Sequence, residues 1–302
     1  ARKVLSVLSQ PFRVIQQEHS TGASVGIAVY PDDGDTVDAL IQNADIAMYD
    51  VKAQGRNSYA FFSEARNTSY SNRVNLGHEL QKAIGAGQLE LYYQPQVSAG
   101  TGNISGLEVL LRWNHPVRGQ ILPEEFVPLA QEAGTIAYMS DWVIRSACGQ
   151  LKEWLEYGVA PVRLGINLAA EQIQQHDFVA KFSELLDELK IDPALLEIEI
   201  TEGTMVRDLD STQEKLSALS ALGIKIAIDD FGMGYSSLSY LRTLPIHAIK
   251  IDRSFIADIK PDSDNTLVNA MMLIGKGLGL RLIAEGVETQ EQLAFLKANG
   301  CD

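Results

Sequence analysis

Apolar residues from Leu89 onward occur in short runs that alternate with longer amphipathic segments. The short runs have the length and composition of buried strands, whereas the longer segments repeat apolar residues at helical spacing. The predicted strands are Leu89–Val97, Ile104–Trp113, Val162–Leu168, Leu195–Thr201, Ile224–Asp229, Ala248–Asp252 and Arg281–Glu285. The predicted helices between them include Ala137–Tyr157, Asp177–Leu189, Ser211–Leu222 and Asn265–Leu278. This alternation favours a parallel α/β architecture.

The first two predicted strands differ from the others, because only the short turn Ser98–Asn103 joins them. A parallel crossover needs about a dozen residues or more, so we expect this pair to be antiparallel. Seven strands are predicted before Asp302, one fewer than an eight-stranded α/β barrel contains.

The N-terminal part has a different pattern, with shorter elements separated by turn residues such as Pro31 to Asp35. The predicted elements are a helix at Ala1–Leu8, strands at Phe12–Gln17 and Ala23–Val29, a helix at Thr36–Ala53 and a strand at Ser58–Phe62. Ser63–Gly87 then becomes amphipathic at helical spacing. We therefore divide the chain into an N-terminal unit of residues 1–63, a linker helix of residues 64–87 and a C-terminal unit of residues 88–302.

Composition narrows the possible functions. The net charge of -14 argues against binding to DNA or RNA polymers, which requires a basic surface. No apolar run reaches the roughly 20 residues that cross a bilayer, and Cys148 and Cys301 suggest neither a disulfide framework nor a metal site. We expect a cytoplasmic protein. An anionic substrate would need bound cations and a few placed basic residues to neutralise it.

Polar residues occur in or at the ends of six apolar strands, where an unpaired charge would be costly. They are Glu108, Asn167, Glu199, Asp229 with Asp230, Lys250 and Glu285. Taken singly, each residue has an ordinary structural explanation. Glu108 is consistent with a structural salt bridge, Asn167 with a turn or cap, and Lys250 with a solvated position at a strand edge. Taken together, they are expected at the carboxyl ends of parallel strands, which meet at one mouth of a barrel where active sites are built.

The types of donor atom predict the chemistry of this cluster. Carboxylates and an amide oxygen suit Mg²⁺ or Mn²⁺, and the absence of His and Cys disfavours zinc. The number of acids permits two ions, and the adjacent Asp229 and Asp230 can contact both. Two cations can clamp a phosphodiester and lower the pKa of a bound water. Glu197 shares a strand face with Glu199, which we prefer because it lies nearer the strand end.

The segment Asp230–Leu238 follows these acids with two glycines and then hydroxyl residues that open a helix. A glycine-rich turn before a helix is by itself more consistent with an ordinary turn and cap. Directly after two acidic residues at a strand end, it becomes a candidate active-site loop that can bind phosphate.

These residues resemble the EAL-domain family, over about residues 76–302. The matching motifs are Tyr92-Tyr-Gln-Pro95, Glu108-Val-Leu-Leu-Arg-Trp113, Asn167, Glu199-Ile-Thr-Glu202, Asp229–Leu238, Lys250-Ile-Asp252 and Glu285-Gly-Val-Glu288. The resemblance implies a TIM-type (β/α)8 barrel with an antiparallel first strand, and metal-dependent hydrolysis of cyclic di-GMP to linear pGpG. It also implies a homodimer through this domain.

The same resemblance assigns roles to individual residues. It implies that Glu108, Asn167, Glu199 and Asp229 ligate one ion, and that Asp229 and Asp230 help to hold a second.

It further implies that Lys250 orients a water and that Glu285 acts as acid or base. Glu202 would steady the Phe231–Ser237 loop, and Glu288 would support the site. Arg112 and Gln94 would contact the substrate.

The sequence departs from the family pattern at several positions. Val109 replaces the alanine of the signature, and its side chain should point away from Glu108. Met233 and Ala169 stand where threonine and serine are common. The family adds a further strand with a site glutamine after Asp302, so we expect the natural protein to continue beyond this residue.

Residues 1–63 resemble the C-terminal third of a GGDEF domain, an α+β fold. The matching pieces are Ser24–Pro31, Ala44–Tyr49 and Lys52–Asn57. The signature Gly-Gly-Asp-Glu-Phe loop is absent from this chain, so it cannot act as a cyclase. We expect a longer parent, and leave open whether it carries upstream sensory domains or an inner-membrane anchor. The alternative to a phosphodiesterase is a catalytically weak or inactive EAL domain that acts as a cyclic di-GMP receptor or regulatory module.

Overall fold

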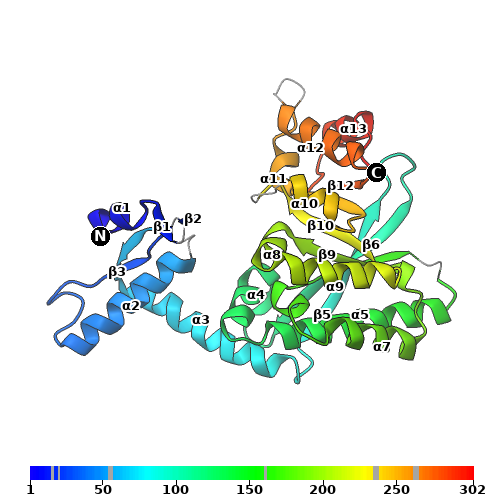
Figure 1. The fold of residues 1–302 in the computed structure, drawn as a ribbon. Helices are drawn as coiled ribbons and strands as arrows, with labels where there is room; N and C mark the ends of the chain where they lie inside the picture. Colours follow the sequence, from blue (N-terminus) through cyan, green and yellow to red (C-terminus); the bar gives the residue numbers. More distant parts are fainter. Residues whose placement is uncertain (15–16, 20, 54–56, 160–161, 234–237, 261–264) are drawn as a thin grey trace. The chain divides into compact units, whose positions relative to one another are not determined.

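The computed structural model describes residues 1–302 except 15–16, 20, 54–56, 160–161, 234–237 and 261–264. The chain forms two compact units, Ala1–Lys82 and Ala83–Asp302 (Figure 1). No helix within the described ranges combines the length and apolarity needed to cross a membrane.

The second unit is built on one curled, mixed sheet. Its strands are β5 (Leu89–Val97), β6 (Ile104–His115), β7 (Gly119–Ile121), β8 (Arg163–Asn167), β9 (Leu196–Thr201), β10 (Lys225–Phe231), β11 (Ala248–Ile251) and β12 (Arg281–Ala284). The hydrogen-bonded order is β12-β11-β10-β9-β8-β6-β5, and β7 pairs with β6. The β5–β6 pair is antiparallel and the pairs from β6 to β12 are parallel. The predicted barrel architecture with an antiparallel first pair is confirmed.

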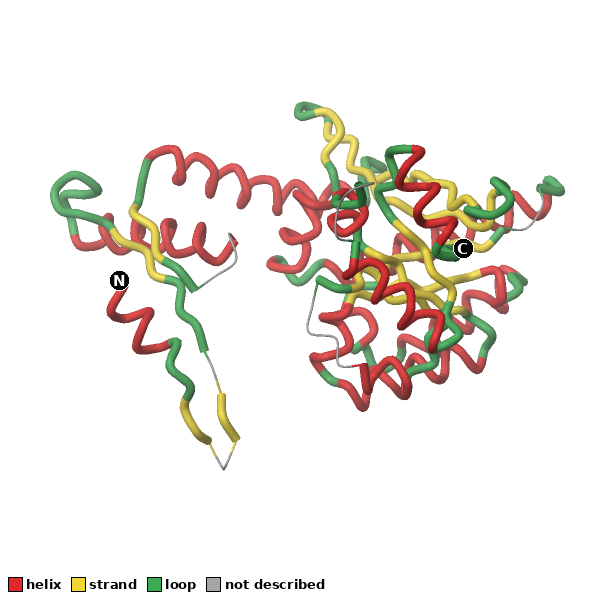
Figure 2. Tube along the Cα trace, turned by 90° about the horizontal axis from the view of Figure 1, so that it is seen from above, coloured by secondary structure: helices red, strands yellow, loops and turns green. Residues whose placement is uncertain are grey.

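Helices lie outside the curled strands of this unit (Figure 2). They are α4 (Pro123–Glu132), α5 (Ile136–Glu156), α6 (Ala170–Ile173), α7 (Phe178–Leu189), α8 (Glu202–Arg207), α9 (Leu209–Ala221), α10 (Leu238–Thr243), α11 (Arg253–Ala257), α12 (Thr266–Gly277) and α13 (Gln290–Ala298), with a short 3₁₀ turn, η1, at Pro193–Leu195. The four long helices predicted from apolar spacing correspond to α5, α7, α9 and α12.

Strand alternation separates an apolar outer face from a polar inner face. In β9, Leu196, Ile198 and Ile200 are at most 1% exposed and belong to the hydrophobic core. Glu197 and Glu199 lie between them and are equally buried, so they point to the opposite face. Burial on both faces is typical of parallel strands covered by helices. The interior of the barrel therefore holds acidic side chains that must find partners there.

The two ends of the sheet approach each other through Asp302. Its N–H donates to the carbonyl of Leu282 in β12 at 3.0 Å, and its carbonyl accepts from the N–H of Ala99, just after β5, at 2.8 Å. Asp302 thus links the last described strand of the sheet to the turn that follows the first.

The first unit contains α1 (Arg2–Leu8), β1 (Phe12–Val14), β2 (Gln17–His19), β3 (Val25–Ile27), α2 (Val37–Ala53), β4 (Tyr59–Phe61) and most of α3 (Glu64–Ala83). β3 and β4 form a parallel pair. At Gly26 a Cβ atom would overlap the carbonyl of Ala44, so only glycine permits α2 to lie this close to β3.

The strand predicted at Phe12–Gln17 is wrong. The chain reverses within it, because β1 and β2 form an antiparallel pair in which Val14 lies opposite Gln17. Each of the two strands has only three residues, which is too short for periodicity to reveal where one ends and the other begins.

Candidate metal centre

The ammonium group of Lys250 is the centre of the buried charge cluster. Its Nζ lies 2.6 Å from Glu199 Oε2, 2.7 Å from Glu285 Oε1, and 3.1 Å from both Glu108 Oε2 and Asp229 Oδ1. These residues come from β6, β9, β10, β11 and the end of β12, so the parallel strands bring their predicted polar residues to one mouth.

The site residues shift each other's pKa values. Burial would lower the pKa of Lys250, but the surrounding carboxylates outweigh this effect and raise it well above its usual value. Burial raises the pKa of Glu199, and Glu108 and Asp229 add to the rise while Lys250 opposes it. Burial likewise raises the pKa of Glu285 to about 7 despite the nearby Lys250. One ammonium group therefore does not offset the burial and mutual repulsion of these acids, so a further cation would favour their ionised forms.

The acids form two groups that share Asp229. Oxygen atoms of Glu108, Glu199 and Asp229 lie within 4.8 Å of one another, and so do those of Asp229, Asp230 and Glu285. Each group offers three carboxylates, which are the hard ligands that Mg²⁺ and Mn²⁺ prefer.

Glu199 shows how closely the site is built. Its Oε1 atom is buried and has no hydrogen-bond donor in the described structure, so it remains available to a cation. A Cβ atom on Gly165 of the neighbouring strand β8 would overlap this oxygen. Glycine at position 165 therefore creates the space that Glu199 occupies. The sequence offered a signal for this role, since Gly165 lies two residues before Asn167 on the same face of its strand.

The backbone at Asp230 explains how two consecutive acids reach one site. Asp230 has a φ of 53°, in the left-handed region, and the pairing of β10 with β11 shifts register between Ile228 and Phe231. This irregularity breaks the alternation that would place the two side chains on opposite faces. A left-handed non-glycine residue is a strained feature that often marks a functional site. Burial, with Asp229 and Asp252 nearby, raises the pKa of Asp230.

The remaining predicted ligand and substrate residues lie around the cluster. Asn167 Nδ2 donates to Glu108 Oε1 at 3.1 Å, which places this amide beside the first acidic group. Gln94 lies directly opposite Glu108 in the β5–β6 register. Arg112 lies four residues further along β6 on the same face as Glu108.

Glu202 begins α8 and lies next to the candidate loop. Its Oε1 accepts a hydrogen bond from the N–H of Gly232 at 2.8 Å, and its side chain is 5% exposed. Residues 234–237 of that loop lie outside the described residues. Met233 is 64% exposed, and its sulfur accepts a hydrogen bond from Ser254 Oγ at 3.5 Å.

Glu288 belongs to neither acidic group among the described residues. It is exposed, and its N–H donates to Gln292 Oε1 at 2.7 Å, where α13 begins. Val109 is buried in the hydrophobic core, on the opposite face of β6 from Glu108, as expected.

Glu197 lies at the other end of the barrel interior. Arg281 donates to both of its carboxylate oxygens, at 2.6 and 2.7 Å, and Arg163 lies 3.9 Å away. These arginines begin β12 and β8, so this ion cluster occupies the amino end of the strands. The structure thus separates Glu197, held by arginines, from Glu199, held by Lys250.

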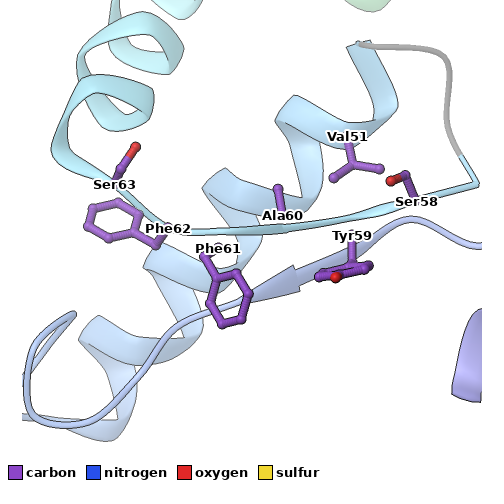
Figure 3. Close-up of a pocket in the computed structure, with 7 residues that line it drawn as sticks. All are labelled: Val51, Ser58, Tyr59, Ala60, Phe61, Phe62 and Ser63. Carbon is purple, nitrogen blue, oxygen red and sulfur yellow. The ribbon is translucent and has the colours of Figure 1, made fainter. Parts of the chain in front are cut away.

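A pocket of about 450 Å³ in the first unit is a less suitable site. Val51 and residues 58–63 line it, and the rings of Tyr59 and Phe61 project from the same side of β4 (Figure 3). Its lining holds no carboxylate, imidazole or ammonium group. The barrel cluster is therefore the candidate site.

The donor set fits divalent cations. It combines carboxylates, a neighbouring amide and a buried carboxylate oxygen without a donor, and neither acidic group contains a His or Cys ligand. Such oxygen-rich sites favour Mg²⁺ or Mn²⁺ over zinc.

Comparison with known proteins agrees with this geometry. The EAL domain family matches residues 78–302, and the family described as diguanylate cyclase, GGDEF domain, matches residues 1–58. The chain is 43% identical over 303 residues to the bifunctional diguanylate cyclase/cyclic di-GMP phosphodiesterase MucR of Pseudomonas aeruginosa, covering 100% of this chain and 44% of MucR. It is 37% identical over 303 residues to the cyclic di-GMP phosphodiesterase NbdA of the same organism, covering 100% of this chain and 39% of NbdA.

A solved structure of the MucR phosphodiesterase in complex with c-di-GMP superposes with a TM-score of 0.72 at 43% identity. The match covers 76% of this chain and 93% of that one. The chain spans less than half the length of the two curated relatives. Family match, sequence identity and fold agree: the chain belongs to the EAL domain family, and a GGDEF-domain segment precedes its EAL domain.

Proposed function

We propose that this chain hydrolyses cyclic di-GMP to linear pGpG with two Mg²⁺ or Mn²⁺ ions. The observation that carries the proposal is the pair of acidic groups that share Asp229 beside the buried Lys250. The names of MucR and NbdA, and the c-di-GMP bound to the MucR phosphodiesterase, support this choice of substrate.

Glu108, Asn167, Glu199 and Asp229 would hold one ion, and Asp229 with Asp230 would hold the other. When bound, such cations neutralise the phosphodiester and lower the pKa of the attacking water. This arrangement also accounts for an anionic substrate on a protein with a net charge of -14.

Two further residues would handle protons and water. Lys250 Nζ stays protonated because its pKa is raised, so it can donate hydrogen bonds that orient the attacking water. The carboxyl group of Glu285 has a pKa of about 7, so it can hold or release a proton near neutral pH.

The outer residues would position the substrate and the loop. Arg112 and Gln94 would contact the nucleotide, since both lie on the face of the β5–β6 pair that carries Glu108. Glu202 would fix the loop through Gly232. The supporting role of Glu288 rests on the motif alone, since it belongs to neither acidic group among the described residues.

The test is conversion of cyclic di-GMP to pGpG by the full-length protein in the presence of Mg²⁺, Mn²⁺ or EDTA. Chromatography measures the pGpG formed in each reaction. We expect turnover with either metal and none with EDTA. A Glu108→Ala variant should lose turnover, whereas Glu188→Ala, which removes an exposed glutamate of α7, should retain it.

The opposite result favours the receptor alternative. Binding of intact cyclic di-GMP in EDTA, without turnover in either metal, would contradict the enzyme and indicate a binding module. A homodimer through the EAL domain is a separate proposal, which sedimentation of the full-length protein tests.

A further inference from the structure

Tyr92 of β5, Arg112 of β6 and Gln120 of β7 share the face of the sheet that carries Glu108. β5 turns Leu89, Leu91 and Tyr93 toward the buried side, so its more exposed residues Glu90, Tyr92 and Gln94 share the other face. In the β5–β6 register Gln94 lies opposite Glu108, Tyr92 opposite Leu110, and Glu90 opposite Arg112. Tyr92 therefore lies between the acidic cluster and Arg112.

Tyr92 makes two contacts on this face. The guanidinium carbon of Arg112 lies 5.5 Å from the centre of the Tyr92 ring, within the range of a cation–π interaction. Gln120 of β7 donates from Nε2 to the Tyr92 hydroxyl at 3.1 Å. The ring is thus fixed from one strand while it contacts the arginine of another.

The charge of Arg112 is not balanced by an acid in this arrangement. Its guanidinium donates to the carbonyl of Leu111 at 2.8 Å, and no carboxylate in the described ranges forms an ion pair with it. Glu90, directly across the strand pair, accepts from Asn114 Nδ2 at 2.7 Å. Arg112 is therefore a cation held by a ring and a carbonyl, which leaves its charge available to an anionic group.

We propose that Tyr92, fixed by Gln120, is a positioning residue that holds Arg112 for a phosphate of the cyclic dinucleotide. This inference rests on the proposed function and adds a residue to that same site. A long arginine side chain loses conformational freedom when it binds a ligand, and a contact that orders it beforehand reduces that cost.

A purely structural role for Tyr92 is less consistent with its surroundings. Its side chain is 44% exposed, whereas Leu89 and Tyr93 on the other face of β5 lie against the protein interior. Removing the ring should therefore change substrate binding more than folding.

The test is a double-mutant cycle in the full-length protein with cyclic di-GMP and Mg²⁺. Loss of the ring in Tyr92→Leu should raise KM about two- to fivefold and leave kcat within about twofold, because a cation–π contact of this kind is weak but acts on binding. Tyr92→Phe keeps the ring and loses only the Gln120 contact, so its effect should be smaller.

The decisive comparison is whether the effect of Tyr92→Leu on KM depends on the presence of Arg112. Arg112→Ala should raise KM more than Tyr92→Leu does, and adding Tyr92→Leu to Arg112→Ala should have no further effect. Tyr138→Leu, which removes an exposed tyrosine of α5, is the matched control and should leave both constants unchanged. Thermal unfolding of each variant separates binding from folding.

The outcomes are distinct. An unchanged KM in Tyr92→Leu, or full additivity with Arg112→Ala, would overturn this inference while the phosphodiesterase assignment stands. If the protein binds the nucleotide without turnover, Kd replaces KM as the quantity measured for each variant of the cycle, and the same two results would overturn the inference. If it neither binds nor cleaves cyclic di-GMP, the proposed function and this inference both fail.

Discussion

Lys250 Nζ lies 2.6 Å from Glu199 Oε2, and both side chains are at most 1% exposed. Three more carboxylates surround the same ammonium group, so its charge holds together acids that would otherwise repel one another. This ion cluster places the candidate metal ligands before any cation binds.

Removing the ammonium group should therefore destabilise the protein as well as inactivate it. Lys250→Met leaves buried carboxylates without their partner, and breaking a buried pair in this way costs about 3–5 kcal/mol of unfolding free energy. Denaturant unfolding in EDTA measures the loss. Lys152→Met, which breaks an exposed pair with Glu156, should cost at most about 1 kcal/mol. Equal losses in the two variants would contradict the role of Lys250.

Gly165→Ala should weaken metal binding. The added Cβ would overlap Glu199 Oε1 and displace that carboxylate, and changes beside a ligand typically reduce metal affinity about 10- to 100-fold. Calorimetric titration with Mn²⁺ measures the affinity.

The matched control is Gly149→Ala in α5, where an added Cβ meets nothing within 4 Å. It should leave metal affinity unchanged and stabilise the helix by up to about 1 kcal/mol. If Gly165→Ala binds Mn²⁺ as tightly as this control, Glu199 is not a ligand held in place by Gly165.

The sequence predicted the strands and the main acids because strong apolar runs made each polar residue conspicuous. Between Glu197 and Glu199 it offered only their distance from the strand end, since both share one face of β9. In the structure their partners differ, because Glu197 pairs with Arg281 at the start of β12 and Glu199 pairs with Lys250 of β11.

Short elements were harder to predict than long ones. The three residues of β7 carry too little periodicity to reveal a strand, so the contact of Gln120 with Tyr92 was not predicted. The reversal between β1 and β2 was missed for a similar reason, since each strand has three residues. Glu288 was predicted from a motif, and its surroundings at the start of α13 do not include the acidic cluster.

Acid should destabilise the barrel through His247. Burial lowers the pKa of His247, Lys225 and Arg163 lower it further, and Glu197 opposes the shift. Its Nδ1 also accepts from the N–H of Ile226 at 3.2 Å, which requires that nitrogen to be unprotonated.

Since the folded pKa of His247 lies below the usual value of 6.5, the unfolded chain takes up the proton first as the pH falls. The stabilisation from the neutral imidazole is complete above pH 6.5 and is lost as the pH falls from there toward the folded pKa. His247→Gln should flatten the decline in unfolding free energy over this window, measured by denaturant unfolding. His176→Gln, which removes an exposed imidazole, serves as the control. Identical slopes in wild type and His247→Gln would contradict the prediction.

Glu199 and Glu197 offer a matched pair for testing whether the carboxyl end of the barrel is the proposed metal-dependent phosphodiesterase site. The most direct measurement is conversion of cyclic di-GMP to pGpG by wild type, Glu199→Gln and Glu197→Gln, with Mg²⁺ and at a temperature where all three are folded. Glu199→Gln should lose activity by about a hundredfold or more, because it removes a charged ligand. Glu197→Gln should stay active although it weakens the buried pair with Arg281, at a cost of about 3 kcal/mol in stability. Equal activity in the two variants, or turnover that persists in EDTA, would contradict the account.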